Sequence, residues 1–308
     1  MFAQTQNELH NMKHMSILAV SLLALVACTP EKKQEADYSQ YVNPMIGTDF
    51  TGNTYPGAQV PFGMVQLSPD NGLPGWDRIS GYFYPDTTIA GFSHTHLSGT
   101  GAGDLYDISF MPVTRPYKEA PAPLGIYSTF SHNDEAASAG YYRVLLKDYN
   151  INVELTATER CGIQRYTFPE AEASVFLNLK KAMNWDFTLD SKIEVVDSTT
   201  IRGYRLSQGW SPLQHVYFET RFSKPFVACH MDTTSIVTKE KGWIGTAYVA
   251  RFDFNTKKDE EILVTTGISG VSMEGAGKNL RAEARRMISI TIKRRLARIG
   301  TDSFPRLR

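Results

Sequence analysis

Glycine is concentrated in one stretch of this chain, and this limits what the stretch can fold into. Eleven of the 23 glycines lie between Asn43 and Asp104, together with six prolines. Glycine permits left-handed backbone angles and close backbone contact at an entropic cost, and proline fixes turns. We therefore expect shaped loops over residues 43–104, and loops held on a scaffold commonly carry binding sites.

The side chains between these glycines suit a sugar. Aromatic faces stack on the CH groups of a pyranose ring, and carboxylates and imidazoles bind its hydroxyls. Trp76 is the strongest candidate because it stands in a Gly-Trp-Asp turn, where a core position is awkward; core packing is the alternative. The predicted substrate contacts are Trp76, Asp77, His94, His96, Asp49 and Asp104, with Tyr82 and Tyr84 in the same stretch. Trp185, Trp210 and Trp243 stand in strand-like sequence and are predicted to be core residues.

Other kinds of site are disfavoured. His94 and His96 share one face if they lie on a strand, but a zinc site needs three or four ligands and no third is near, so we predict no metal site. A buried imidazole is the alternative to sugar contact. Gly99 to Gly103 is followed by strand-like rather than helical sequence, which disfavours nucleotide binding. No Gly-x-Ser-x-Gly elbow is present, so a serine hydrolase is unsupported.

The remainder of the chain predicts an all-β fold. Apolar and polar residues alternate with period two, and turn residues separate the runs. The runs are 141–146, 151–158, 175–179, 193–196, 216–222, 244–254 and 262–268. Because no amphipathic helices lie between them, we predict a large antiparallel β-sandwich over residues 41–276.

The N-terminus predicts export. An apolar run of twelve, Ser16–Ala27, follows a basic start at Met12 and is too short to span a bilayer. Leu25-Val-Ala-Cys28 resembles a lipobox, so residues 1–28 are a predicted lipoprotein signal helix, with 1–11 as an expected start-site artefact. Cys28 would then be lipidated, residues 29–40 would be a tether, and the protein would lie in the periplasm or on the outer membrane, held by its lipid alone. A plain secretory signal is the alternative. Cys161 and Cys229 are predicted to be free thiols, although the compartment would permit a disulfide.

Charge is unevenly distributed. Residues 278–308 hold ten Lys and Arg and two acids, which leaves 22 basic and 30 acidic residues in 1–277. An acidic main body repels phosphates, so nucleic acid is excluded as a partner.

Three motifs in order carry a resemblance: VNPMIGTDFTGNTYPGAQVPFGMVQLSPDN, GWDRISGYFY and GFSHTHLSGTGAGD. They resemble the N-terminal domain of glycoside hydrolase family 92, the bacterial exo-α-mannosidases, and the likeness extends over residues 41–284. The resemblance implies a sandwich of the supersandwich type. It also implies inverting, calcium-dependent hydrolysis of mannose-containing N-glycans, with both catalytic carboxylates and the calcium ligands in a second domain. No catalytic residue and no metal ligand is then expected on this chain.

The tail departs from the family. Residues 277–284 are helix-prone, and the basic residues after them predict a truncated linker helix and tail over 277–308, the product of a frameshift or truncation. A basic helix that touches anionic lipid is the alternative. We predict a substrate-shaping, carbohydrate-binding domain that is inactive alone. The alternatives are a free-standing carbohydrate-binding lipoprotein and a structural cap that docks onto a separate catalytic half.

Overall fold

The computed structural model describes residues 38–283, except 100, 122–123, 181–185, 233–235, 240–242 and 247. The predicted signal helix with Cys28, most of the predicted tether and the tail after residue 283 lie outside the described residues. Within these residues no helix combines the length and the apolar character that a membrane crossing requires.

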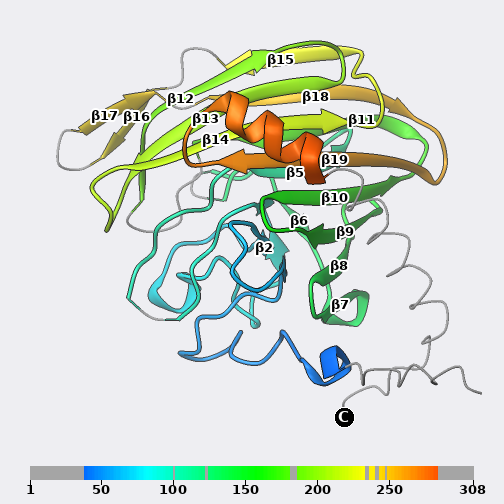
Figure 1. The fold of residues 1–308 in the computed structure, drawn as a ribbon. Coiled ribbons are helices and arrows are strands. Elements are labelled where there is room, and N and C mark those ends of the chain that lie inside the picture. Colours follow the sequence, from blue (N-terminus) through cyan, green and yellow to red (C-terminus); the bar gives the residue numbers. More distant parts are fainter. Residues whose placement is uncertain are drawn as a thin grey trace, which may run out of the picture. The chain divides into compact units, whose positions relative to one another are not determined.

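The described chain folds into antiparallel sheets, as the alternating pattern predicts (Figure 1). A seven-stranded sheet has the order β1 (Ala58–Gln59), β2 (Gln66–Asp70), β4 (Gly91–Ser93), β5 (Ser109–Thr114), β11 (Ala171–Asn178), β18 (Val249–Thr256) and β15 (Ala228–Asp232). An eight-stranded sheet has the order β12 (Phe187–Val195), β13 (Thr200–Gln208), β14 (Gln214–Phe222), β19 (Glu260–Ser269), β10 (Cys161–Phe168), β9 (Ile151–Ala157), β8 (Tyr141–Leu146) and β7 (Glu135–Ser138).

Smaller elements connect these strands. Two short pairs join β3 (Thr88–Ile89) to β6 (Ser128–Thr129) and β16 (Ile236–Lys239) to β17 (Trp243–Thr246). The 3-10 turns are η1 (Tyr38–Tyr41), η2 (Trp76–Arg78) and η3 (His132–Asp134). An α-helix covers residues 273–283, at the place where the sequence is helix-prone.

The two large sheets share one apolar core. Alternate residues of β9 and β13 are buried, which is the period-two pattern of strands with one face on a core. Phe222 of β14 contacts both Phe110 of β5 and Phe252 of β18, at ring-centroid distances of 6.5 and 5.2 Å, so aromatic rings join the sheets. β10, β13 and β15 are not among the strands that the sequence analysis singles out, although β13 has the alternating pattern.

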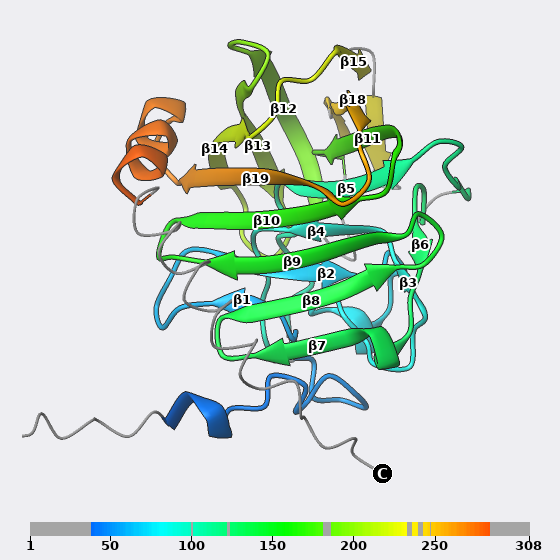
Figure 2. The ribbon, with the colours of Figure 1, turned by 90° about the vertical axis from the view of Figure 1, so that its right-hand side faces the viewer.

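The α-helix of residues 273–283 is fixed to the eight-stranded sheet (Figure 2). Leu280 packs against Cys161 and Ile163 at the start of β10. Glu283, which is buried, accepts hydrogen bonds from the backbone N and Nε of Arg160 at 3.1 and 2.7 Å. This end of the described chain is therefore held by packing and by a buried carboxylate.

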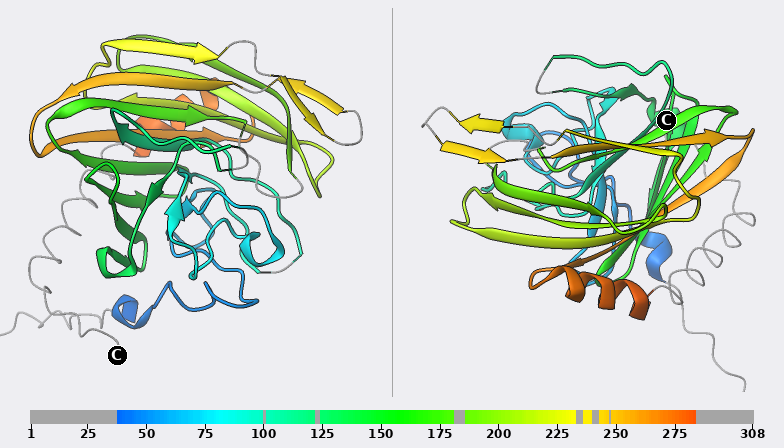
Figure 3. Two further views of the ribbon diagram at one scale, coloured as in Figure 1. Left: turned by 180° about the vertical axis from the view of Figure 1, so that it is seen from behind. Right: turned by 90° about the horizontal axis from the view of Figure 1, so that it is seen from above.

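Residues 43–108 form the irregular part of the domain. Figure 3 shows this segment in blue and cyan beside the long strands, with short strands and long connections. Among the described residues, six of the eight non-glycine residues with positive φ fall here: Phe50, Asn53, Phe62, Leu105, Tyr106 and Ile108. Such angles are costly for side chains with a Cβ, so long-range contacts must hold this segment in place.

Candidate functional site

Asn53 joins the loops of the glycine-rich segment. It is buried and left-handed, with φ of 50°, and its carbonyl accepts a hydrogen bond from Gly99 N at 2.7 Å. With its amide oriented to satisfy its surroundings, Nδ2 donates to the carbonyls of Trp76 and Asp77 at 3.1 and 3.2 Å. Asn53, which belongs to the first motif, thus contacts both of the other two motifs.

Trp76 and Asp77 lie at the surface on η2. The Trp76 side chain is 53% exposed, so the prediction that it lies outside the core is confirmed. Asp77 is partly exposed, and its carboxylate interacts electrostatically with Arg78. The turn is held from behind by Arg78, whose Nε and Nη2 donate to Asp86 at 2.6 and 2.5 Å. An open indole next to an open carboxylate is suited to a sugar ring and its hydroxyls.

Asp49 is also partly exposed, but its carboxylate is engaged locally. Its Oδ1 accepts the backbone N of Phe50 at 2.7 Å, which stabilises a turn in which Phe50 is left-handed. Its role as a sugar contact stays a prediction.

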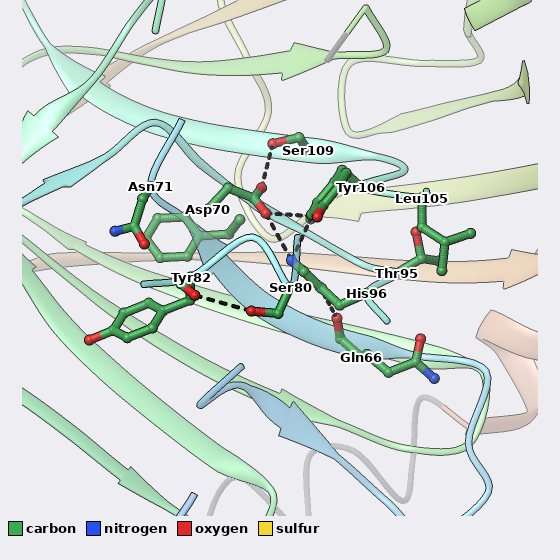
Figure 4. A network of polar contacts seen from close by, with 12 residues as sticks. Gln66, Asp70, Asn71, Ser80, Tyr82, Thr95, His96, Leu105, Tyr106 and Ser109 are labelled. Carbon is green, nitrogen blue, oxygen red and sulfur yellow. Dashed lines mark hydrogen bonds and ion pairs between the residues drawn. The ribbon is translucent and has the colours of Figure 1, made fainter. Parts of the chain in front are cut away.

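His96 is buried in a polar network (Figure 4). Its Nε2 lies 2.8 Å from Asp70 Oδ1, and its Nδ1 lies 2.7 Å from the Gln66 carbonyl oxygen. Ser93 Oγ donates to the same Asp70 oxygen at 3.0 Å, and the carboxylate is fully buried. Asp70 is therefore the common partner of the side chains in this network. Imidazole and carboxylate hold strand β2 against the loop after β4.

His94 is buried apart from that network. Its Nδ1 donates to the Ile108 carbonyl at 2.8 Å, and its ring packs edge-on against Phe110. A side chain at Gly162 would contact the His94 ring, since a Cβ there would lie 2.7 Å from Cδ2. Desolvation lowers the pKa of His94 to about 4, so the ring is neutral at physiological pH. Of the two alternatives that the sequence left open, these positions favour the buried imidazole for both His94 and His96.

Asp104 is buried and holds a distant loop. Its carboxylate accepts hydrogen bonds from Trp210 N at 2.9 Å, Ser211 N at 3.2 Å and Gln214 Nε2 at 3.0 Å. With its oxygens satisfied in this way, Asp104 acts here as a support, and direct sugar contact by it stays a prediction that this geometry does not favour.

The segment after Asp104 is strained and locked. Leu105, Tyr106 and Ile108 have φ of 85°, 67° and 56°. Asp107, between them, lies 2.6 Å from Nη1 of the fully buried Arg205, whose Nη2 lies 2.8 Å from Asp186. Arg205 belongs to β13, so this Asp-Arg-Asp triad ties the glycine-rich segment to the eight-stranded sheet. Burial raises the pKa of Asp186, and the two carboxylates raise the pKa of Arg205 against its own desolvation.

Three features of the site were missed by the sequence analysis. The prediction that Trp210 is a core residue is wrong, since its side chain is 79% exposed; the Gly209-Trp-Ser sequence, which parallels Gly75-Trp-Asp, was the available signal. Tyr84 stacks face to face on His132 at 4.0 Å between ring centroids. Arg205 carries no local signal, because its partners lie far away in sequence. Trp185 and the side chain of Trp243 lie outside what the structure describes.

Two further predictions concern metal binding and the cysteine thiols. The part of the chain that the structure describes holds no group of three His, Cys, Asp or Glu residues that could bind a metal ion. Cys161 and Cys229 are free thiols, as predicted; the first is buried and the second half-buried.

The comparisons with known proteins show the class to which this antiparallel sandwich belongs. Residues 41–269 match the glycosyl hydrolase family 92 N-terminal domain. The chain belongs to this family, and the match covers its antiparallel sandwich.

Solved structures agree with this. The chain is similar to a family GH92 α-mannosidase from Bacteroides thetaiotaomicron in complex with mannoimidazole, with 39% identity and a TM-score of 0.72 over 80% of this chain and 34% of that one. It is also similar to a family GH92 inverting mannosidase from Bacteroides thetaiotaomicron VPI-5482, with 27% identity and a TM-score of 0.66 over 82% of this chain and 34% of that one. An uncharacterized secreted glycosidase of Arthroderma benhamiae is 26% identical over 172 residues, 53% of this chain and 21% of its own length. The chain therefore spans about a third of the solved relatives it matches.

Proposed function

We propose that the β-sandwich is the substrate-shaping, carbohydrate-binding domain of an inverting, calcium-dependent α-mannosidase that acts on N-glycan mannosides. The single observation that carries this is the Trp76–Asp77 pair, an exposed indole beside an open carboxylate on a turn fixed by Asn53 and Arg78. The solved relatives support the substrate class, because one is an α-mannosidase in complex with mannoimidazole and another is an inverting mannosidase.

We propose further that this chain alone hydrolyses little or nothing. Inversion needs two carboxyl groups about 6.5–9.5 Å apart, one as acid and one as the base that activates water. The buried carboxylates of the glycine-rich segment are engaged with His96, with the 210–214 loop and with Arg205. A group with these duties is poorly suited to exchange protons with a substrate. The described residues hold no group of three His, Cys, Asp or Glu that could bind a metal ion, so we assign the calcium ligands to the second domain.

Turnover and binding test the two parts of this proposal separately. With the purified chain and an aryl α-mannoside we expect no measurable release of aglycone, and clear turnover would overturn the proposed inactivity.

Because half of a two-domain site binds weakly, methyl α-mannoside should bind in the millimolar range, measured by chemical-shift changes of the tryptophan indole N–H groups. Trp76→Ala should abolish these changes. Phe62→Ala is the matched control, since Phe62 is an exposed aromatic of the same segment and should leave binding unchanged.

A second candidate function has its own support. Ile46, Phe50, Phe62 and Met64 are exposed apolar residues of the glycine-rich segment. Exposed apolar groups of this kind favour protein contact. A structural cap would use them to dock onto a separate catalytic half, and it would bind no sugar. In that case the Trp76 indole would not respond to methyl α-mannoside, while a separately expressed second domain would bind the chain.

For location we propose export, with Cys28 as a lipid anchor in the periplasm or on the outer membrane. The support is the signal-like sequence and the secreted relative from Arthroderma benhamiae. Cys28→Ala should release the protein into the soluble fraction. Unchanged recovery with membranes would contradict the anchor.

A further inference from the structure

Trp210 lies on a loop that a buried carboxylate holds by several hydrogen bonds. The loop, residues 209–213, joins β13 to β14, and its indole is 79% exposed. Asp104, itself only 3% exposed, accepts the Trp210 and Ser211 N–H groups and the Gln214 amide. Gly209 is required for this approach, because a Cβ there would lie 2.2 Å from Asp104 Oδ1. A buried carboxylate from 106 residues away thus holds a tryptophan in solvent.

The loop shares its support with the Trp76 turn. Two residues beyond Asp104, the Tyr106 hydroxyl donates to the Ile79 carbonyl, and Ile79 N in turn donates to the Trp76 carbonyl at 3.4 Å. Leu105 and Tyr106 are both left-handed. Residues 104–106 therefore carry one exposed tryptophan at each end of a short, strained frame. The Trp76 and Trp210 turns are therefore connected through one three-residue segment, by Asp104 on one side and by Tyr106 on the other.

The surroundings of Trp210 suit a sugar better than a protein. Ser211 and Gln214 place polar side chains on the same stretch as the indole, and Pro212 restricts the backbone between them. The apolar residues of the loop besides the indole are Pro212 and Leu213, and Leu213 is about half exposed. Two such side chains fall far short of the roughly 800 Å² per partner that a stable protein interface buries. A sugar needs only one aromatic face with polar groups around it, and the loop offers this arrangement.

We propose that Trp210 is a second sugar-contacting residue, which binds a ring of an α-linked mannose oligosaccharide beyond the ring held at Trp76. This rests on the proposed function of the Trp76–Asp77 pair. Trp210 then sets preference for longer chains. Asp104 is its positioning residue, which explains why an aspartate that looks like a sugar ligand in the sequence is buried in the structure.

The test compares methyl α-mannoside with a linear α-linked mannotriose on the intact chain, by indole N–H chemical shifts and titration. The triose should shift the resonances of both Trp76 and Trp210, and the monosaccharide that of Trp76 alone. Trp210→Ala should weaken the triose about fivefold to tenfold, a normal effect for one aromatic contact, and leave the monosaccharide unchanged. Trp210→Tyr should restore most of the loss. Asp104→Asn should weaken the triose alone, in a chain whose circular dichroism is unchanged.

The outcomes separate the two proposals. If the triose shifts Trp76 but not Trp210, and Trp210→Ala binds it normally, the inference is overturned and the proposed function stands. If neither sugar shifts Trp76, the proposed function fails and this inference fails with it. If Trp210→Ala weakens both sugars equally, Trp210 acts on the shared frame rather than on a further ring, which also overturns the inference.

Discussion

The sandwich sheets and the glycine-rich segment 43–108 are stabilised in different ways. In the sheets, strands such as β10 and β19 pair over eight consecutive residues, and their inner faces are apolar. In the glycine-rich segment the strands have two to five residues, and buried polar side chains hold the loops in place. Asn53, Asp70, His96, Asp104 and Asp107 each hold a backbone group or a charged partner.

This difference explains why one part forms a scaffold and the other part presents side chains. Backbone pairing repeats along a strand, so a single substitution removes a small share of it. A buried polar residue has few partners, and its loss leaves each of them unsatisfied. Loops held in this way can keep exposed aromatics in place, but each loop depends on one or two residues.

The largest expected effect is at Arg205. Arg205→Leu leaves Asp107 and Asp186 buried without their cation, and we expect the free energy of unfolding to fall by about 3–5 kcal/mol. Urea unfolding measures this. Arg202→Leu is the control on the same strand, because its ion pair with Glu194 is at the surface, and its loss of stability should be far smaller. Equal losses of unfolding free energy in the two variants would show that the buried triad stabilises the fold no more than a surface ion pair does.

The pH dependence of two histidines should have opposite signs. His94 has a pKa lowered to about 4 by burial, so the unfolded chain binds a proton there between pH 6.5 and 4 while the folded chain does not. Its contribution destabilises the fold as pH falls, by roughly 3 kcal/mol across that range. Comparing urea unfolding of the wild type and His94→Gln between pH 7 and 4 isolates this slope, which the variant should lose.

His132 provides the contrast, because both of its ring nitrogens face acceptors. Nδ1 lies 2.7 Å from Glu135 Oε2, and Nε2 lies 2.7 Å from the Tyr84 carbonyl. Glu135 also accepts the hydroxyls of Tyr82 and Tyr142, and its hydrogen bond raises the pKa of His132 against partial desolvation. This stabilisation is fully present below pH 6.5 and is lost as pH rises through the raised pKa. An imidazole titration by NMR that placed His132 below 6.5 would contradict this assignment.

The smallest effect concerns an exposed residue. Phe62 has φ of 60° and is fully exposed, so its ring contributes no burial. Glycine tolerates that angle and alanine does not, so Phe62→Gly should be more stable than Phe62→Ala by about 1 kcal/mol. In the sandwich the order should reverse, with Val195→Ala more stable than Val195→Gly by about 0.5–1 kcal/mol. Thermal unfolding of the four variants measures the relative stability of glycine and alanine at each position. If the same residue were the more stable one at both positions, the two regions would not differ in this respect.

The sequence by itself determined the scaffold, the loops and the family. Alternation in segments such as 151–158 and 262–268 is local information, and so are the glycines of 43–104 and the order of the three motifs. The surface position of Trp76 could also be predicted from local sequence, because the three consecutive residues Gly-Trp-Asp indicate a turn.

Only the tertiary structure decided which polar residues are buried and which group holds Trp210 in solvent. His94, His96 and Asp104 look like ligands in a loop, yet their partners are Ile108, Asp70 and the distant 210–214 loop. Gly209 before Trp210 is a local turn signal, but the carboxylate that holds the Trp210 loop comes from 106 positions away. Burial depends on what the rest of the chain brings to a residue, and contacts across a hundred residues leave no trace in the local pattern.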